Sequence, residues 1–340
     1  MKNTTKSGII VLVIMIIAVT GYSIYTIKGQ DNYYGNALQS TGSSYRVAET
    51  SETYDPIAAK NYKNEFIAAL YIEGTIQEEN DTYNQKWLMS TIHGLKENKK
   101  NVAIALYIDS PGGAVYQADE VYLALQDYKT TGRPVYVYQG PMAASGGYYI
   151  SCAGNKIYAN RNTLTGCIGV ISGTSFDLTG LFDELGIKST TIHSGANKNM
   201  MNYNEPLTEE QQAIMQAICD ECYDQFVSIV SKGRSIQYFT AQKLADGRLY
   251  TAKQALDARL IDAIDSWDNM LLDLAENELK KPGIKLNTYK SPKKKHGMFD
   301  LITGKAIDIE NAKAASKLGL PAEVMKSMNN RNFMPMYLAQ

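Results

Sequence analysis

The sequence has little cysteine, little histidine and almost no net charge. Its 340 residues carry 34 basic and 35 acidic side chains, which leaves a formal net charge of −1. Such a balance gives no electrostatic reason to expect a nucleic-acid partner. Cys219 and Cys222 form a single CxxC pair with no second pair and no histidine nearby, which is a poor metal-binding pattern. We therefore expect neither a metal nor a cofactor.

One long apolar run without any charge lies near the start of the chain, at residues 8–27. Its length matches the hydrocarbon core of a bilayer. Lys2 and Lys6 precede it, so the positive-inside rule places residues 1–7 in the cytoplasm and the remainder of the chain outside it. A cleaved signal peptide is the alternative, but the small-residue cleavage pattern is poor. The sequence thus predicts a single-pass protein of the cell membrane.

The remaining chain divides into three parts. Residues 28–63 are polar and are expected to form an extracytoplasmic tether. Residues 64–282 alternate β-prone apolar runs with amphipathic helical patterns, which predicts parallel strands joined by helical crossovers in an α/β fold. Residues 283–340 contain a run of lysines and lack a core pattern. They are expected to be a C-terminal extension, either a small helical unit or a loosely ordered tail.

Two glycine-rich turns each follow an apolar β-prone run. Ser145 stands among small residues in the turn 140–149, a relaxed form of the nucleophile elbow in which small neighbours leave a serine Oγ exposed. A turn that only lets a helix pack on a strand would have the same composition. Ser110-Pro111-Gly112-Gly113 follows the run 102–108, and such a turn can direct backbone N–H groups at a developing oxyanion. The second turn favours a nucleophilic Ser145 over a turn that serves only for packing.

A serine needs a base to become a useful nucleophile. Among the three histidines, only His193 lies near plausible site elements, after a strand predicted at Lys188–Ile192. Lys198 follows shortly afterwards. A lysine can accept a proton only where burial favours its neutral form, so the residues alone leave both bases open.

The two turns resemble those of the ClpP/crotonase superfamily, whose fold is built from repeated β-β-α units. In that superfamily the first glycine of the Pro-Gly-Gly turn and the residue after the serine stabilise the oxyanion, which implies Gly112 and Gly146 here. The segment Ser194–Lys198 narrows the resemblance to the signal peptide peptidase A family of membrane-bound Ser–Lys proteases. Further matching motifs lie at 163–170, 226–234 and 246–262.

The resemblance implies a serine endopeptidase in which Ser145 is the nucleophile and Lys198 is the base. Its expected substrates are signal peptides or other short, extended, apolar peptides. Cys167 occupies a position where the family typically has a serine that holds the lysine amine, so it is expected to orient Lys198 with a weaker thiol partner. Thr165 and Ser151 are other hydroxyls that could assist.

The resemblance also bears on assembly. Double-length members of the family take the serine from one copy of the domain and the lysine from the other. A chain with one copy is therefore expected to form a ring-like homo-oligomer with shared sites. The expected partners are peptides, the lipid bilayer and further copies of the chain. Two alternatives are a crotonase-type acyl-CoA enzyme and a non-catalytic membrane scaffold with the same fold.

Overall fold

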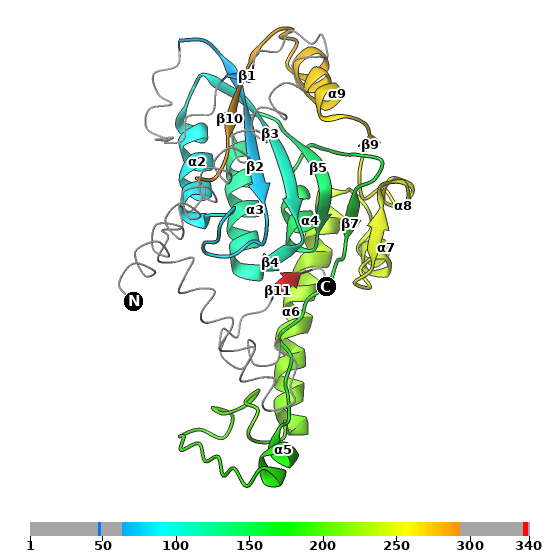
Figure 1. The fold of residues 1–340 in the computed structure, drawn as a ribbon. Helices are drawn as coiled ribbons and strands as arrows, with labels where there is room; N and C mark the ends of the chain where they lie inside the picture. The colour runs from blue at the N-terminus through cyan, green and yellow to red at the C-terminus, as the bar shows by residue number, and fades with distance from the viewer. Residues whose placement is uncertain (1–46, 49–62, 293–335, 339–340) are drawn as a thin grey trace, which may run out of the picture. The chain divides into compact units, whose positions relative to one another are not determined.

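The computed structural model describes residues 47–48, 63–292 and 336–338 (Figure 1). The chain divides into two units, residues 1–46 and 47–340, and the fold described below is that of the second unit. The predicted cytoplasmic segment 1–7 and transmembrane helix 8–27, and most of the predicted tether, lie outside the described residues. Within the described ranges, no helix is both long enough and apolar enough to cross a membrane.

The centre of the fold is a largely parallel sheet, which has nine strands among the described residues. Its main path runs β1-β10-β2-β3-β5-β6-β9; β7 pairs with β5, and β8 pairs antiparallel with β7. β4 and β11 form a separate antiparallel pair. The strands are β1 (Val47–Ala48), β2 (Phe66–Glu73), β3 (Asn101–Ser110), β4 (Gly112–Ala114), β5 (Val135–Ala144), β6 (Lys156–Ala159), β7 (Leu164–Gly166), β8 (Leu249–Thr251), β9 (Ala263–Ile264), β10 (Lys285–Tyr289) and β11 (Met336–Leu338).

Helices cover both faces of this sheet. They are α2 (Gln85–Glu97), α3 (Val115–Lys129), α4 (Gly146–Ser151), α5 (Thr179–Glu184), α6 (Glu209–Gly233), α7 (Tyr238–Leu244), α8 (Ala252–Asp257), α9 (Trp267–Leu272) and the π-helical η2 (Asp273–Glu278). Along β2, Ala68 and Leu70 belong to a core shared with α2, α3 and α4, whereas Ile67 and Ala69 belong to a core shared with α9 and η2. Because both faces are buried, the central strands read as continuous apolar runs.

The strand-and-helix alternation predicted from the sequence is present, with local differences at the ends of elements. The long helix α6 begins at the predicted capping box, in which the side chains of Thr208 and Gln211 each accept a hydrogen bond from the other residue's backbone N–H. The strand predicted at Lys188–Ile192 is wrong, because these residues pair with no strand and Ile192 is 96% exposed. The sheet also extends past residue 282, since β10 lies between β1 and β2.

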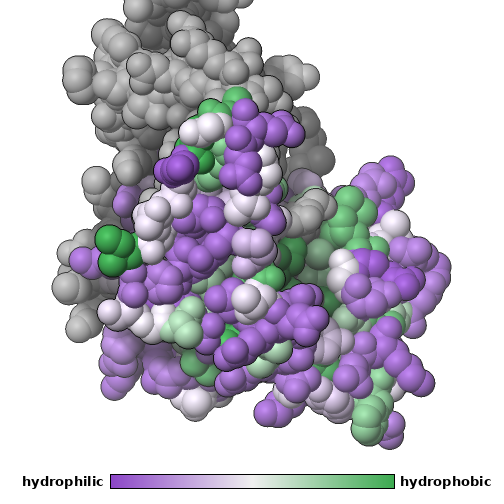
Figure 2. All heavy atoms as spheres, turned by 90° about the horizontal axis from the view of Figure 1, so that it is seen from below, coloured by the Kyte–Doolittle hydropathy of each residue, from purple (hydrophilic) through white to green (hydrophobic). Residues whose placement is uncertain are grey.

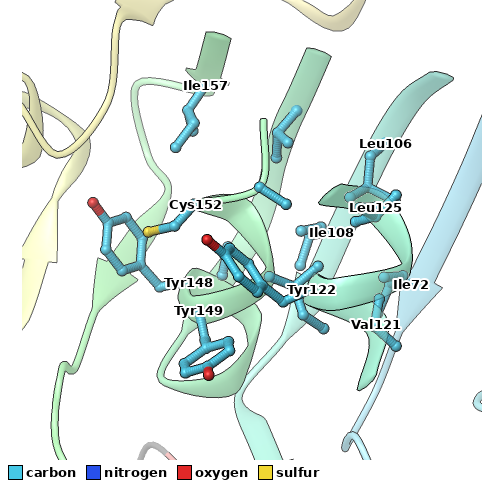
Figure 3. Close-up of a cluster of buried hydrophobic side chains, with 14 of the residues drawn as sticks. Ile72, Leu106, Ile108, Val121, Tyr122, Leu125, Tyr148, Tyr149, Cys152 and Ile157 are labelled. Carbon is cyan, nitrogen blue, oxygen red and sulfur yellow. The ribbon is translucent and has the colours of Figure 1, made fainter. Parts of the chain in front are cut away.

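The core on the α3 and α4 side supplies a test of this packing. Leu106 lies in the central strand β3 and is fully buried among Ile108, Leu125 and their neighbours (Figure 3). We expect Leu106→Ala to lower the free energy of unfolding by about 2–5 kcal/mol, since it leaves a cavity. Leu123 on α3 is 55% exposed, so Leu123→Ala should change the free energy of unfolding by only about 0.5 kcal/mol. Urea titration measures both, and equal effects would contradict the assignment of the core.

Candidate active site

Ser145 occupies a sharp turn between a strand and a helix, as the sequence predicted. β5 ends at Ala144 and α4 begins at Gly146. The backbone of Ser145 has φ 52° and ψ −116°, a conformation that is strained for a residue with a Cβ. Its N–H donates to the Gly166 carbonyl at 2.7 Å, and its carbonyl accepts the Tyr149 N–H at 2.8 Å. Strain held in place by such bonds is typical of functional positions.

The hydroxyl of Ser145 is buried and unpaired. The residue is 1% exposed, and its Oγ has no hydrogen-bond partner in the described structure. Leaving a buried hydroxyl unsatisfied costs about 1–3 kcal/mol. Natural proteins satisfy nearly all such groups, so an exception calls for an explanation. A nucleophile that awaits its base and its substrate is such an explanation.

Helix α4 is held rigidly behind this serine. Figure 3 shows Tyr148 and Tyr149 of α4 packed beside Tyr122 of α3. The Tyr148 hydroxyl donates to the Leu260 carbonyl at 2.8 Å. The Tyr149 hydroxyl donates to the Asp119 carboxylate at 2.6 Å. Burial raises the pKa of Tyr148 well above its ordinary value, so its hydroxyl remains a donor. These bonds fix the element that positions Ser145.

The two glycine-rich turns pack backbone against backbone. β3 and β5 run side by side, with Ser110 opposite Ala143 at their ends. A Cβ placed on Gly146 would lie 3.3 Å from the Cα of Gly112 and 3.2 Å from the backbone nitrogen of Gly113. Such an approach leaves little room for any larger residue. The Pro-Gly-Gly turn is therefore brought directly to the residue after the serine.

The two glycines of the Pro-Gly-Gly turn have different backbone surroundings. The N–H of Gly112, expected to be a donor, instead donates to the buried Oγ of Ser110 at 3.1 Å. The backbone of Ile76 pairs with one edge of β4. Its N–H donates to the Gly112 carbonyl, and its carbonyl accepts the Ala114 N–H, both at 2.8 Å. Because backbone groups alternate along a strand, those of Gly113 face the opposite edge. The backbone nitrogen nearest to Gly146 is that of Gly113.

Cys167 lies beside the serine through the pairing of β7 with β5. Gly166 is opposite Ala144 in that register, so Cys167 follows immediately after the residue that accepts the Ser145 N–H. Its own N–H donates to the Arg248 carbonyl at 2.8 Å. Burial raises the pKa of its thiol, so the sulfur carries a proton at neutral pH and can act as a weak donor.

The other hydroxyls considered from the sequence already have backbone partners. Thr165 Oγ1 donates to the Ala143 carbonyl at 2.8 Å. Ser151 Oγ donates to the Gly147 carbonyl at 2.8 Å and accepts from the amide of Gln139. These bonds support the turn around Ser145.

Neither candidate base reaches Ser145 within one chain. Lys198 and His193 are both exposed, in the irregular segment between α5 and α6. The second half of α6 packs in the core through Phe226, Val227 and Val230. Figure 1 shows α5 beside the opposite end of α6, away from the sheet. The segment that carries Lys198 therefore lies away from the turn that carries Ser145. Among the residues described, no cluster of His, Cys, Asp or Glu could hold a metal ion.

The close approach at Gly113 gives a prediction. A Cβ on Gly113 would lie 1.9 Å from the Ile76 carbonyl oxygen, so Gly113→Ala should force the two segments apart and lower the melting temperature by several degrees. A Cβ added to Gly180 in α5 would have no atom within 4 Å. Gly180→Ala should therefore leave the melting temperature almost unchanged. Thermal unfolding followed by circular dichroism compares them. Equal melting temperatures would contradict this packing of the turns.

Comparison with known proteins relates the chain to a family of peptidases. The model of peptidase family S49 matches residues 127–281, a range that contains Ser145, Cys167 and Lys198. The putative signal peptide peptidase SppA of Enterococcus faecium is 32% identical over 232 residues, which are 66% of this chain and 67% of that protein.

Two further proteins have lower sequence identity to this chain or match a smaller share of it. The chloroplastic serine protease SPPA of Arabidopsis thaliana is 31% identical over 180 residues, 53% of this chain and 26% of that protein. Among solved structures, a ClpP1 mutant from Listeria monocytogenes superposes with a TM-score of 0.41 at 17% identity, over 59% of this chain and 94% of that one. On the strength of the S49 match and the SppA relative, the chain belongs to peptidase family S49, the family of signal peptide peptidase SppA, and is a serine protease.

Proposed function

We propose that this protein is a membrane-anchored endopeptidase with a Ser145–Lys198 dyad that forms between two copies of the chain. The observation that carries the proposal is the Ser145 hydroxyl, which is buried without a partner, while Lys198 is exposed on a separate segment. Each chain thus contains a nucleophile without a base and a base without a nucleophile. A neighbouring copy that presents Lys198 completes the site.

The reaction is acyl transfer. Ser145 Oγ attacks a peptide carbonyl while the amine of Lys198 accepts its proton and later returns it to the leaving amine. The N–H groups of Gly113 and Gly146 stabilise the oxyanion. Water then hydrolyses the acyl-enzyme by the reverse sequence of proton transfers. A lysine amine accepts a proton only in its neutral form, which burial favours, and docking against a second copy is what would bury Lys198.

The segment that carries Lys198 has the surface expected of an interface. Leu185 is 49% exposed, Ile187 is 44% exposed and Ile192 is 96% exposed. Figure 2 views the structure from below and shows hydrophobic patches among hydrophilic ones. Apolar side chains gathered on a projecting segment indicate a contact with another protein. A head-to-tail contact that repeats from copy to copy closes into a ring, which is the assembly we propose.

In this assembly Cys167 is the contact for the incoming amine. It adjoins Ser145 through the β7–β5 register, and its thiol is protonated because burial raises its pKa. A neutral lysine amine can accept a weak hydrogen bond from this thiol and can donate one to the sulfur. Cys167 therefore positions Lys198 and takes no part in bond making.

The proposed substrates are short, extended, apolar peptides such as signal peptides. Ser145 is 1% exposed and its turn is enclosed by backbone, so a folded protein surface cannot reach the Oγ. The apolar run at residues 8–27 is proposed to anchor the enzyme in the membrane with its catalytic domain outside the cytoplasm.

Mixing two inactive variants tests whether the site is shared. Ser145→Ala and Lys198→Ala should each lose nearly all peptidase activity. When equal amounts exchange subunits at random, about one interface in four combines an intact serine with an intact lysine. We expect roughly that share of wild-type activity to return. If mixed oligomers form and no activity returns, each chain holds its own dyad. His193→Ala serves as the control and should remain active.

The role of Cys167 is tested by Cys167→Ser. A hydroxyl is a stronger and shorter hydrogen-bond partner than a thiol, so kcat/KM should be preserved or should rise by up to about tenfold. Cys167→Ala removes the partner and should lower kcat/KM with little change in KM. Steady-state kinetics on one fluorogenic peptide separates the two variants. A large loss with serine would show that the thiol has another role.

A further inference from the structure

Three tyrosines form a row across the central strands β2, β3 and β5, which lie side by side (Figure 1). Tyr71 is opposite Tyr107 in the strand register, and Tyr107 is opposite Tyr138. The ring centres of Tyr71 and Tyr107 are 4.9 Å apart, and those of Tyr107 and Tyr138 are 5.8 Å apart. Trp267, the first residue of α9, lies between 5.7 and 6.0 Å from all three rings. These four side chains form one aromatic surface, which we call the tyrosine row.

Part of the tyrosine row is open to solvent, although parallel sheets are normally covered on both faces. On this face α9 and η2 cover Ile67 and Ala69 of β2. Tyr71, Tyr107 and Trp267 are only half-buried, so the described elements leave part of the face uncovered. The uncovered part lies toward the carboxyl ends of β2 and β3. Ligands of α/β sheets bind at this end of the strands.

Carboxylates surround the open part of the row. Burial raises the pKa of Tyr71 and of Tyr107 to about 12, and the negative charges of nearby carboxylates add to the effect. These carboxylates belong to Glu73, Asp109 and Asp268. The phenols are therefore neutral at physiological pH, while the carboxylates beside them are charged. An aromatic face with negative charges at its rim attracts cations.

A lysine of the chain already uses one end of the row. The Nζ of Lys290 lies 4.1 Å from the centre of the Tyr71 ring and 3.8 Å from a carboxylate oxygen of Glu73. An ammonium group over an aromatic face is a favourable contact, and a carboxylate strengthens it. One positive charge against the three carboxylates leaves the surface negative. It can therefore attract a second cation.

The row lies within reach of the candidate active site. Tyr138 and Ser145 are seven residues apart along β5 and its following turn, which corresponds to about 20 Å of extended chain. Gly140 lies between them next to the Tyr107 ring, since an added Cβ would be 2.6 Å from the Tyr107 hydroxyl oxygen. An extended peptide bound at Ser145 would span this distance with about six or seven residues.

We propose that the tyrosine row is a subsite for a lysine or arginine side chain of a peptide substrate, about six or seven residues from the bond that Ser145 cleaves. The proposal rests on the proposed function, because it assumes that peptides bind at Ser145. It adds a preference for positive charge to the preference for apolar peptides. The aromatic rings and the carboxylates both contribute to the selectivity, and added salt weakens the contribution of the carboxylates.

A binding experiment tests the subsite in full-length Ser145→Ala protein, which cannot hydrolyse peptides. Two short, capped fluorescent peptides of alanine and leucine differ at one end, which carries lysine or its neutral analogue norleucine. We expect the lysine peptide to bind about three- to tenfold more tightly. Adding Asp268→Asn should reduce this preference about two- to fivefold. Fluorescence anisotropy measures the affinities.

The matched control is Glu97→Gln. It also removes one exposed carboxylate, but from α2, which packs on the other face of the sheet. This variant should keep the full preference for lysine. Equal affinity of Ser145→Ala protein for the two peptides, or equal effects of Asp268→Asn and Glu97→Gln, overturns the proposal.

Hydrolysis by the Ser145-containing protein separates this inference from the proposed function. Mass spectrometry locates the cleaved bond, and lysine should favour a bond about six or seven residues away through a lower KM. Asp268→Asn should raise that KM. A lysine preference in binding, together with an active-site serine that cleaves neither peptide, supports the inference and contradicts the proposed function. Cleavage of both peptides with the same KM supports the proposed function and overturns the inference.

Discussion

The close approach of two glycine-rich turns is the constraint on which the rest of the site depends. A Cβ added to Gly146 would lie 3.2 Å from the Gly113 nitrogen and 3.3 Å from the Gly112 Cα, which is tighter than an ordinary contact. This contact requires β3 and β5 to end side by side, which the parallel sheet provides. It also brings the backbone nitrogen of Gly113 beside the serine turn. Ser110, buried at the end of β3, holds the turn by accepting the Gly112 N–H.

The residues proposed to act in catalysis lie on segments with different degrees of burial. Ser145, Gly113 and Gly146 lie in the buried body of the fold, whereas Lys198 lies on an exposed segment. Under the proposal, each chain holds its own nucleophile and oxyanion site. The base, Lys198, is supplied by a neighbouring copy when the chains assemble.

The sequence predicted those features that depend on local patterns. The elbow at Ser145 and the capping box at Thr208 follow from residue types at fixed spacings, and both are present. The bond from the Gly112 N–H to the Ser110 side chain could not be predicted in this way, because it depends on how the backbone folds at the turn.

Strand pairing over long separations was also beyond local patterns. The run Lys188–Ile192 contains β-branched residues typical of a strand, but it pairs with no strand among the described residues. β10 and β11 are short, and each is defined by its partner, β2 or β4, which lies far away in the sequence. The base at Lys198 was inferred from the family resemblance, since an exposed lysine carries no local sign of catalysis.

The central claim is that Ser145 is an activated nucleophile, and covalent labelling tests it most directly. The full-length protein is treated with a fluorophosphonate probe, digested and mapped by mass spectrometry. The account predicts that the phosphonyl group is found on Ser145, and that Lys198→Ala, which removes the base, abolishes the labelling. Absence of labelling in a folded, assembled protein would favour a non-catalytic scaffold. Modification at Ser110 or Ser151 would also contradict the account, because the nucleophile would then be a different serine.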